Sequence, residues 1–166
     1  QFSKAFFGAA GTPLVEDGRV LANIGGQNGA GIVAFSASTG DVLWTSTNEE
    51  ASYSSPIVAT FGGVRHAVFF TRDNVVALDP ATGRVRFERS WRARIRASVN
   101  AATPLVVDEH LFISAQYGTG AGVFRIAGLE MEEVWAADDV LSNHYATSVY
   151  HDGYLYGYHG RQEYGP

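Results

Sequence analysis

Six polar residues near the end of the chain are the best candidates for binding or proton-transfer chemistry. They supply two imidazoles, a guanidinium, a carboxylate, an amide and a phenol, and they are Asn143, His144, Tyr145, His159, Arg161 and Glu163. Imidazole and carboxylate groups exchange protons near neutral pH when a ligand is held beside them. Histidines in loops are more often simply solvated. The sequence therefore predicts a ligand-binding set here and assigns no catalytic residue.

A second candidate is a stripe of alternating arginines, Arg92, Arg94 and Arg96. In an extended segment, alternate side chains project to one side. Guanidinium groups arranged in this way bind carboxylates or phosphates in a bidentate manner. The alternative is a solvated loop that pairs with nearby acidic loops. Six of the twelve basic residues of the chain lie between residues 84 and 96.

Acidic residues gather between residues 130 and 139, where Asp138 and Asp139 are adjacent. A pair of carboxylates binds a hard cation only when other oxygens join it. No calcium-loop pattern surrounds this pair, so the sequence predicts no metal site. The chain also lacks a P-loop, a nucleophile elbow and a zinc-protease motif.

The composition narrows the class of protein. The chain has 166 residues, of which 46% are hydrophobic and 17% are charged, and this balance is typical of a globular protein. Its net charge of −5 argues against nucleic-acid binding. No run of 18 apolar residues is present, which argues against direct membrane insertion. The absence of cysteine excludes disulfides and thiol chemistry.

The elements that must position these residues are short strands. Residues 54–91 contain four apolar or alternating runs separated by turn signals, and the predicted strands are 54–60, 66–71, 74–78 and 84–88. The turns between them include Gly62-Gly63 and a Pro-Ala-Thr-Gly sequence ending at Gly83. Four strands in fewer than forty residues indicate a β-meander.

The same unit repeats along the chain. Pro13 and Pro56 are 43 positions apart, and Pro56 and Pro104 are 48 apart. The same two spacings separate three aromatic residues, Trp44, Phe87 and Trp135. A four-stranded unit that recurs every forty to fifty residues indicates a β-propeller blade. The predicted fold is therefore an all-β propeller of antiparallel blades.

The predicted division of the chain gives three and a half blades. The segments are 1–11 (leading segment), 12–47 (blade 1), 48–91 (blade 2), 92–137 (blade 3) and 138–166 (first half of blade 4). An open arc exposes the apolar faces and strand edges at its ends, and such edges recruit partners. The sequence thus predicts that the chain is part of a larger protein, or that copies of it associate into an oligomer.

Meander topology sorts the connections onto two faces. The links between strands 2 and 3 lie on the same side as the links between blades, and we call this side the loop face. The turns joining strands 1 and 2, and strands 3 and 4, lie on the opposite side, which we call the turn face. The loop-face segments are longer and more varied, and the six polar residues described first belong to them. Function on a rigid scaffold concentrates in such loops.

Residues 33–44 and 76–87 share the pattern Ala-x-(Asp/Ser)-x-x-Thr-Gly-x-x-x-(Trp/Phe), which resembles the PQQ-like β-propeller repeat. This resemblance implies that the repeated aromatic residue packs between neighbouring blades. The family includes quinoprotein dehydrogenases, an outer-membrane assembly lipoprotein and other exported bacterial proteins. It therefore implies a periplasmic or otherwise extracytoplasmic location.

Catalytic members of that family hold a quinone over a metal ion beside a vicinal disulfide, which this cysteine-free chain cannot form. The predicted function is therefore a non-catalytic scaffold that binds a protein, peptide or glycan through its loop face, without a cofactor. The alternative is part of a quinone-dependent or metal-assisted oxidoreductase that lacks the remaining blades. Only under this alternative are PQQ and calcium expected.

Overall fold

The computed structural model describes residues 8–93, 95 and 98–160, and these form strands, turns and loops. Blade 1 contains β1 (Leu14–Glu16), β2 (Arg19–Asn23), β3 (Ile32–Ser36) and β4 (Val42–Ser46). Blade 2 contains β5 (Ile57–Phe61), β6 (Val64–Phe70), β7 (Asn74–Leu78) and β8 (Val85–Ser90). Blade 3 contains β9 (Leu105–Val107), β10 (His110–Ala115), β11 (Gly120–Ala127) and β12 (Glu130–Ala137). A fourth sheet contains β13 (Val149–His151) and β14 (Tyr154–Tyr156).

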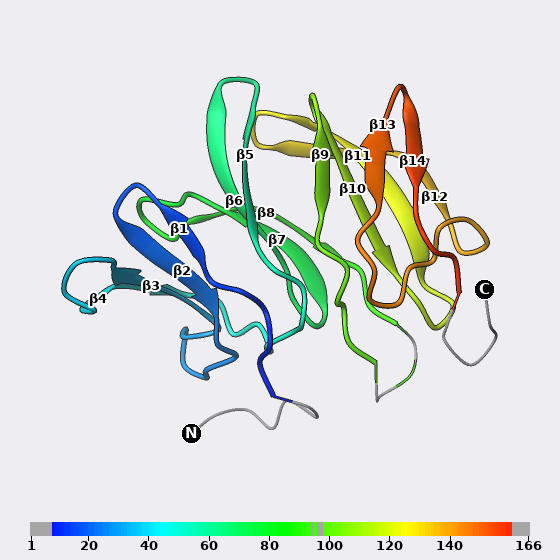
Figure 1. Cartoon of the computed structure of the whole chain (residues 1–166). Coiled ribbons are helices and arrows are strands. Elements are labelled where there is room, and N and C mark those ends of the chain that lie inside the picture. Colours follow the sequence, from blue (N-terminus) through cyan, green and yellow to red (C-terminus); the bar gives the residue numbers. More distant parts are fainter. Residues whose placement is uncertain (1–7, 94, 96–97, 161–166) are drawn as a thin grey trace.

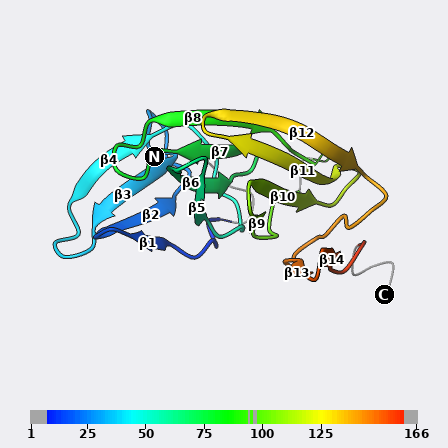
Figure 2. The same cartoon turned by 90° about the horizontal axis from the view of Figure 1, so that it is seen from above.

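Each sheet is an antiparallel meander in which strands pair in chain order. The sheets stand side by side as the blades of a partial propeller (Figure 1). Viewed from above, β4, β8 and β12 lie along the outer side of the arc, and β13 and β14 form its last sheet (Figure 2). The predicted all-β fold of four-stranded blades is confirmed. The described residues contain no helix long and apolar enough to cross a membrane.

The turn face is built from tight turns that glycine makes possible. In the first turn of blade 1, Asp17 and Gly18 have φ values of 46° and 73°. Gly62 and Gly63 repeat this geometry in blade 2 with 54° and 76°, and residues 152–153 do so in blade 4. Positive φ at both central residues matches the twist of the flanking strands in a two-residue hairpin. The turns predicted at these positions are therefore present.

The three repeated aromatic residues occupy equivalent positions in the sheets. Each one pairs with strand 3 of its own blade directly beside a β-bulge. The three pairs are Trp44 with Ala34, Phe87 with Ala77, and Trp135 with Val123. A bulge re-aims the side chains next to it and increases the local twist. The register predicted from the sequence spacing is therefore correct.

Trp44 shows how one blade covers the next. Its indole nitrogen donates a hydrogen bond to the carbonyl of Pro80 in blade 2, with a distance of 3.3 Å. The ring lies against Gly83, where an added Cβ would be 2.5 Å from a ring carbon. Gly83 also has a φ of 74°. The Thr-Gly turn of blade 2 thus requires glycine for its backbone and for the tryptophan that packs on it.

Phe87 lies in the core between blades 2 and 3, where only 9% of it is exposed and it belongs to a cluster with Phe124 and Ile126. Trp135 is 37% exposed and Trp44 is half-buried, so of the three aromatic residues expected to be buried between blades only Phe87 is buried. The exposure of Trp135 is explained by the blade that lies beside it. Trp135 belongs to the last complete blade, and the structure describes only β13 and β14 of the blade beside it.

Hydrogen bonds also join the segments that lead into successive blades. The amide of Thr12 donates to the hydroxyl of Ser55 at 3.2 Å, and the amide of Thr103 donates to the hydroxyl of Thr147 at 3.0 Å. Between them, the hydroxyl of Ser54 donates to the carbonyl of Ala102 at 3.0 Å. These bonds tie each blade to the next at its first strand.

Candidate functional site on the loop face

The predicted ligand-binding residues meet where the chain passes from blade 3 into blade 4. The backbone amide of Ser142 donates a hydrogen bond to Nδ1 of His159 at 3.2 Å. The amide of Gly160 donates to the carbonyl of Ser142 at 3.0 Å, and Asn143 forms a parallel bridge with Gly160. Two segments separated by seventeen positions therefore lie side by side on the loop face, below β13 and β14 in Figure 1.

Asn143 is fully buried and holds this junction together. Its backbone amide donates to the hydroxyl of Ser114 at 2.7 Å. Its side-chain amide donates to the hydroxyl of Ser148 at 2.8 Å. Because its side chain is turned inward, Asn143 positions the neighbouring residues and does not itself present a polar group at the surface.

The next two residues form an aromatic stack with a tyrosine from blade 3. The rings of His144 and Tyr145 are stacked, with centroids 3.7 Å apart and an interplanar angle of 28°. Tyr117 meets the His144 ring edge-on at 5.1 Å. His144 is 7% exposed, whereas Tyr145 is 52% exposed. His144 is therefore the buried ring of the stack, and Tyr145 is its exposed ring.

Tyr117 was not among the residues predicted from the sequence. It lies in the short loop between β10 and β11 and has a φ of 66°. A positive φ at a bulky residue is uncommon and is a reason to look for a function. It is followed by Gly118, Thr119 and Gly120, which indicate only a turn. The stacking partner becomes visible only when the connection into blade 4 is placed beside this loop.

His159 is exposed, and its hydrogen bond fixes its tautomer. Nδ1 accepts the proton of the Ser142 amide, so in the neutral ring the hydrogen must be on Nε2. In that tautomer Nε2 is a hydrogen-bond donor. His159 therefore holds the Ser142 segment in place through Nδ1.

The arginine stripe is only partly described. Arg92 forms an ion pair with Asp73 of blade 2, and both side chains are about one-third exposed. Arg94 and Arg96 lie outside the described residues, as do Arg161 and Glu163 from the other predicted set. Arg92 therefore follows the alternative reading of a loop arginine paired with a neighbouring acidic loop.

Two carboxylates from different blades, Glu49 and Glu88, interact in a way that the sequence did not indicate. Glu49 accepts hydrogen bonds from the hydroxyl of Thr71 and, at 2.8 Å, from the side-chain amide of Asn74. Burial, and then the charge of Glu49, raise the pKa of Glu88. Glu49 follows the last strand of blade 1 in the sequence, and the fold of the chain brings it against Thr71 and Asn74 of blade 2.

The described residues do not fit a quinone–metal centre. Within them, no three His, Asp or Glu side chains gather in a way that would hold a metal ion. Asp138 and Asp139, the adjacent carboxylates considered for calcium, are both exposed and have no third acidic ligand beside them in this part of the chain. The sequence also contains no cysteine for a disulfide beneath a quinone.

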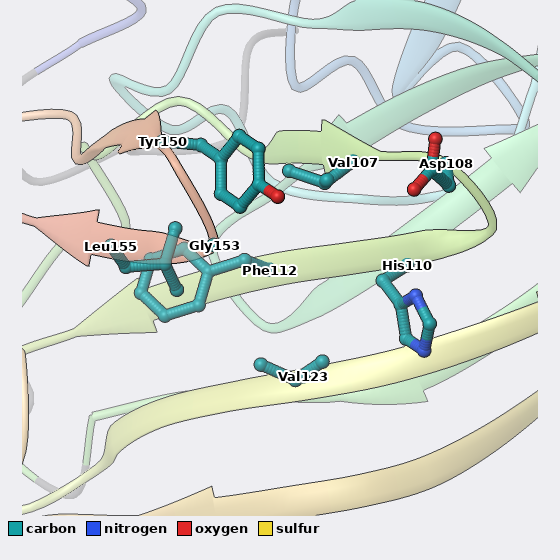
Figure 3. A pocket seen from close by; sticks show the side chains of 8 residues that line it. All are labelled: Val107, Asp108, His110, Phe112, Val123, Tyr150, Gly153 and Leu155. Carbon is teal, nitrogen blue, oxygen red and sulfur yellow. The ribbon is translucent and has the colours of Figure 1, made fainter.

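A separate groove of about 280 Å³ opens between blade 3 and the β13–β14 sheet. Its apolar wall contains Phe112, Val123 and Leu155, while Asp108 and His110 stand at one end (Figure 3). Tyr150 closes the opposite side (Figure 3). The groove occupies the place that packed side chains fill between blades 2 and 3, so it belongs to the inter-blade core rather than to the loop face.

At the equivalent place between blades 2 and 3 lies a fully buried histidine, His66. Its ring sits between Phe61 and Phe87, with centroid distances of 5.5 and 5.6 Å. Neither ring nitrogen has a hydrogen-bond partner of normal geometry in the described structure, and the backbone of Gly128 offers only a weak interaction. Burial, and then the positive charge of Arg86, lower the pKa of His66. The imidazole is therefore held neutral as a core side chain.

Comparison with known proteins gives a match over almost the whole chain. A family model described as outer membrane protein assembly factor BamB matches residues 1–163. Among solved structures, the crystal structure of BamB from Moraxella catarrhalis matches with a TM-score of 0.60 and 18% sequence identity. The alignment covers 89% of this chain but only 46% of that protein, so this chain spans less than half of its length. No significant match was found among curated protein sequences.

Proposed function

We propose that this chain, which belongs to the BamB family of PQQ-like β-propellers, is a non-catalytic scaffold that binds a protein, peptide or glycan through its loop face. The observation that carries the proposal is the stack of Tyr117, His144 and Tyr145. It presents the exposed ring of Tyr145 on the buried ring of His144, which Tyr117 contacts edge-on. Rigid aromatic residues supply contact area at little cost in conformational entropy.

The proposal extends to location and assembly. An extracytoplasmic location agrees with membership of a family described by an outer membrane assembly factor. The exposed outer surface of β13 and β14, which includes Val149 and Tyr156, favours association with further blades or with another copy of the chain. Sedimentation of the purified chain at micromolar concentration tests this part, and a well-behaved monomer would contradict it.

The binding function is tested by selecting peptides from a random display library on the immobilised chain. Selected peptides are then titrated against two matched variants, Tyr145→Ser on the loop face and Tyr154→Ser near the turn face. Each variant removes one exposed phenol. We expect the first variant to lose binding and the second to retain it. Equal loss in both variants, or selection of no binder, would overturn the loop-face scaffold.

The rival function is part of a quinone-dependent oxidoreductase. It is tested by adding PQQ and calcium to the chain and recording the absorption spectrum of the protein after dialysis. A retained quinone spectrum would support the enzyme and contradict the scaffold. The cysteine-free sequence and the lack of a three-ligand cluster in the described residues favour the scaffold.

A further inference from the structure

One asparagine in the chain is followed by glycine, and it is Asn28, in the loop between β2 and β3 that lies below β2 in Figure 1. The other five asparagines precede a residue with a side chain, and they are Asn23, Asn48, Asn74, Asn100 and Asn143. Glycine has no Cβ to hinder its own backbone nitrogen from approaching the asparagine side chain before it. Asn28 is also exposed to solvent. Sequence and exposure therefore make Asn28 the asparagine that is most open to spontaneous deamidation.

Deamidation of Asn28 requires only water. The backbone nitrogen of Gly29 gives its proton to hydroxide and bonds to Cγ of Asn28, while the side-chain nitrogen of Asn28 takes up a proton and leaves as ammonia. Water then opens the resulting succinimide ring to aspartate or isoaspartate, and no electrons are transferred. The new carboxyl group ionises at about pH 4, so the net charge of the chain becomes one unit more negative than −5.

The attacking nitrogen is held by a side chain from another segment. The backbone amide of Gly29 donates a hydrogen bond to Oδ1 of Asn48, in the connection between blades 1 and 2, at 2.8 Å. A hydrogen bond that an N–H donates stabilises the protonated form of the nitrogen. Because the proton must leave before the ring can close, this hydrogen bond opposes the first step of the reaction.

The conformation of the loop keeps Gly29 within reach of Asn48. At the base of the loop, the side-chain amide of Asn23 donates to the carbonyl of Gly31 at 2.9 Å. At its tip, Asn28 and Gly29 have φ values of 59° and 81°. Asparagine and glycine adopt this left-handed conformation more readily than other residues do. The residues that favour deamidation are thus the ones that the loop conformation requires.

The product would disturb the contact between this loop and the connection to blade 2. A Cβ on Gly31 would lie 2.4 Å from the backbone nitrogen of Glu49, and a Cβ on Gly25 would lie 2.6 Å from that of Ala51. Isoaspartate inserts one additional carbon into the backbone, for which such close packing leaves little room. The new carboxylate also lies in a loop that packs on a connection with two acidic residues, Glu49 and Glu50.

We propose that Asn28 is a site of spontaneous deamidation on the loop face, and that the hydrogen bond from Gly29 to Asn48 slows the reaction in the folded protein. This inference does not depend on the binding function proposed above. It assigns a covalent modification to one loop and a protecting residue to a different segment of the chain. Modified chains carry an additional carboxylate on the loop face.

The experiment incubates the natural chain at pH 9 and 37 °C and follows each asparagine by mass spectrometry of proteolytic peptides. We expect Asn28 to deamidate before any of the other five. Asn48→Ala should raise the rate at Asn28 about 2- to 12-fold, the range that corresponds to the net strength of one hydrogen bond. Asn48→Asp keeps an acceptor for the Gly29 amide and should not raise the rate.

Three controls separate this hydrogen bond from a general loosening of the protein. Hydrogen exchange of the Gly29 amide, measured by NMR, should become faster in Asn48→Ala, because exchange and ring closure need the same bond to open. Asn23→Ala removes the bond to Gly31 but leaves Asn48 in place, so it should change the rate less than Asn48→Ala does. Asn28→Gln should abolish the modification, because its ring would have six members and closes much more slowly.

Three results would overturn the proposal. Deamidation of another asparagine before Asn28 would remove the site. An unchanged rate in Asn48→Ala, or an equal increase in Asn23→Ala, would remove the protecting role of Asn48. If Asn48→Ala does not fold, the natural chain is compared with a synthetic peptide of residues 24–32, which lacks Asn48. The peptide should deamidate faster at Asn28, and equal rates in the two would contradict protection by the fold.

Discussion

The interface between blades 2 and 3 and the interface between blades 3 and 4 use equivalent residues in very different surroundings. Phe87 and Trp135 occupy the same register position beside a bulge, yet 9% of the first and 37% of the second is exposed. Phe87 is covered by Phe124 and Ile126 of blade 3. Burial at a repeated position is thus decided by the neighbouring blade and not by the residue type.

The largest expected effect comes from truncating the two equivalent aromatic residues. Phe87→Ala should lower the free energy of unfolding by about 3–5 kcal/mol, because it leaves a cavity in the inter-blade core. Trp135→Ala should cost less than about half of that, since its ring is already partly solvated. Denaturant melts of both variants measure the difference. Equal losses would mean that the two interfaces are packed alike.

A matched pair of glycines sharpens the same contrast between covered and uncovered positions. Gly83 and Gly40 have φ values of 74° and 78°, but only Gly83 lies under a tryptophan ring. Gly40→Ala should cost about 1–2 kcal/mol from backbone strain alone. Gly83→Ala should cost clearly more, because the new methyl group displaces Trp44. If both alanine variants lose the same free energy of unfolding in denaturant melts, the contact between Trp44 and Gly83 is not tight.

His66 makes the interface between blades 2 and 3 sensitive to acid. Its folded-state pKa is lowered, so between that value and the ordinary value of about 6.5 the unfolded chain binds more protons. Stability should therefore fall as the pH drops below about 6.5, by about 1.4 kcal/mol for each unit of lowering.

Chemical denaturation at pH 7.5 and pH 5.5 measures this, with His66→Phe as the comparison because His66 packs between two other aromatic rings, Phe61 and Phe87. The variant should lose less stability over this interval than the natural chain. Other groups titrate equally in both proteins and cancel. An identical loss in both would show that His66 does not contribute to the acid sensitivity.

The smallest effect is expected for a surface ion pair that links blades 2 and 3. Arg89 and Glu133 are each about 40% exposed. A double-mutant cycle with Arg89→Ala and Glu133→Ala should give a coupling energy of about 0.2–1 kcal/mol that decreases in high salt. A larger, salt-independent coupling would place this pair among the forces that decide how the two blades pack.

Much of the fold follows from local sequence signals. The strand β7 has the predicted bounds, and the tight turns lie where glycines and aspartates predicted them. Period-two alternation and turn chemistry act over a few residues, so one chain is enough to recognise them. The exposure of Trp135 did not follow, because it depends on a surface contributed by a different blade.

The candidate site was likewise predicted only in part from the sequence. Meander topology predicted that residues 143–145 and His159 lie in one neighbourhood, and the structure brings them together. Tyr117 was missed because its role depends on an unusual backbone angle and on a ring from another blade. The inward orientation of Asn143 depends on the hydroxyls of Ser114 and Ser148, which no spacing rule connects to it.

The hydrogen bonds that tie successive blades together span nearly constant lengths of chain: 43 residues from Thr12 to Ser55, 48 from Ser54 to Ala102 and 44 from Thr103 to Thr147. The entropy of closing a chain loop depends only on the logarithm of its length. Every junction therefore closes at nearly the same entropic cost, however many blades precede it. Each blade can therefore be added to its predecessor at a similar cost of chain closure, so the blades behave as a series of equivalent nearest-neighbour junctions.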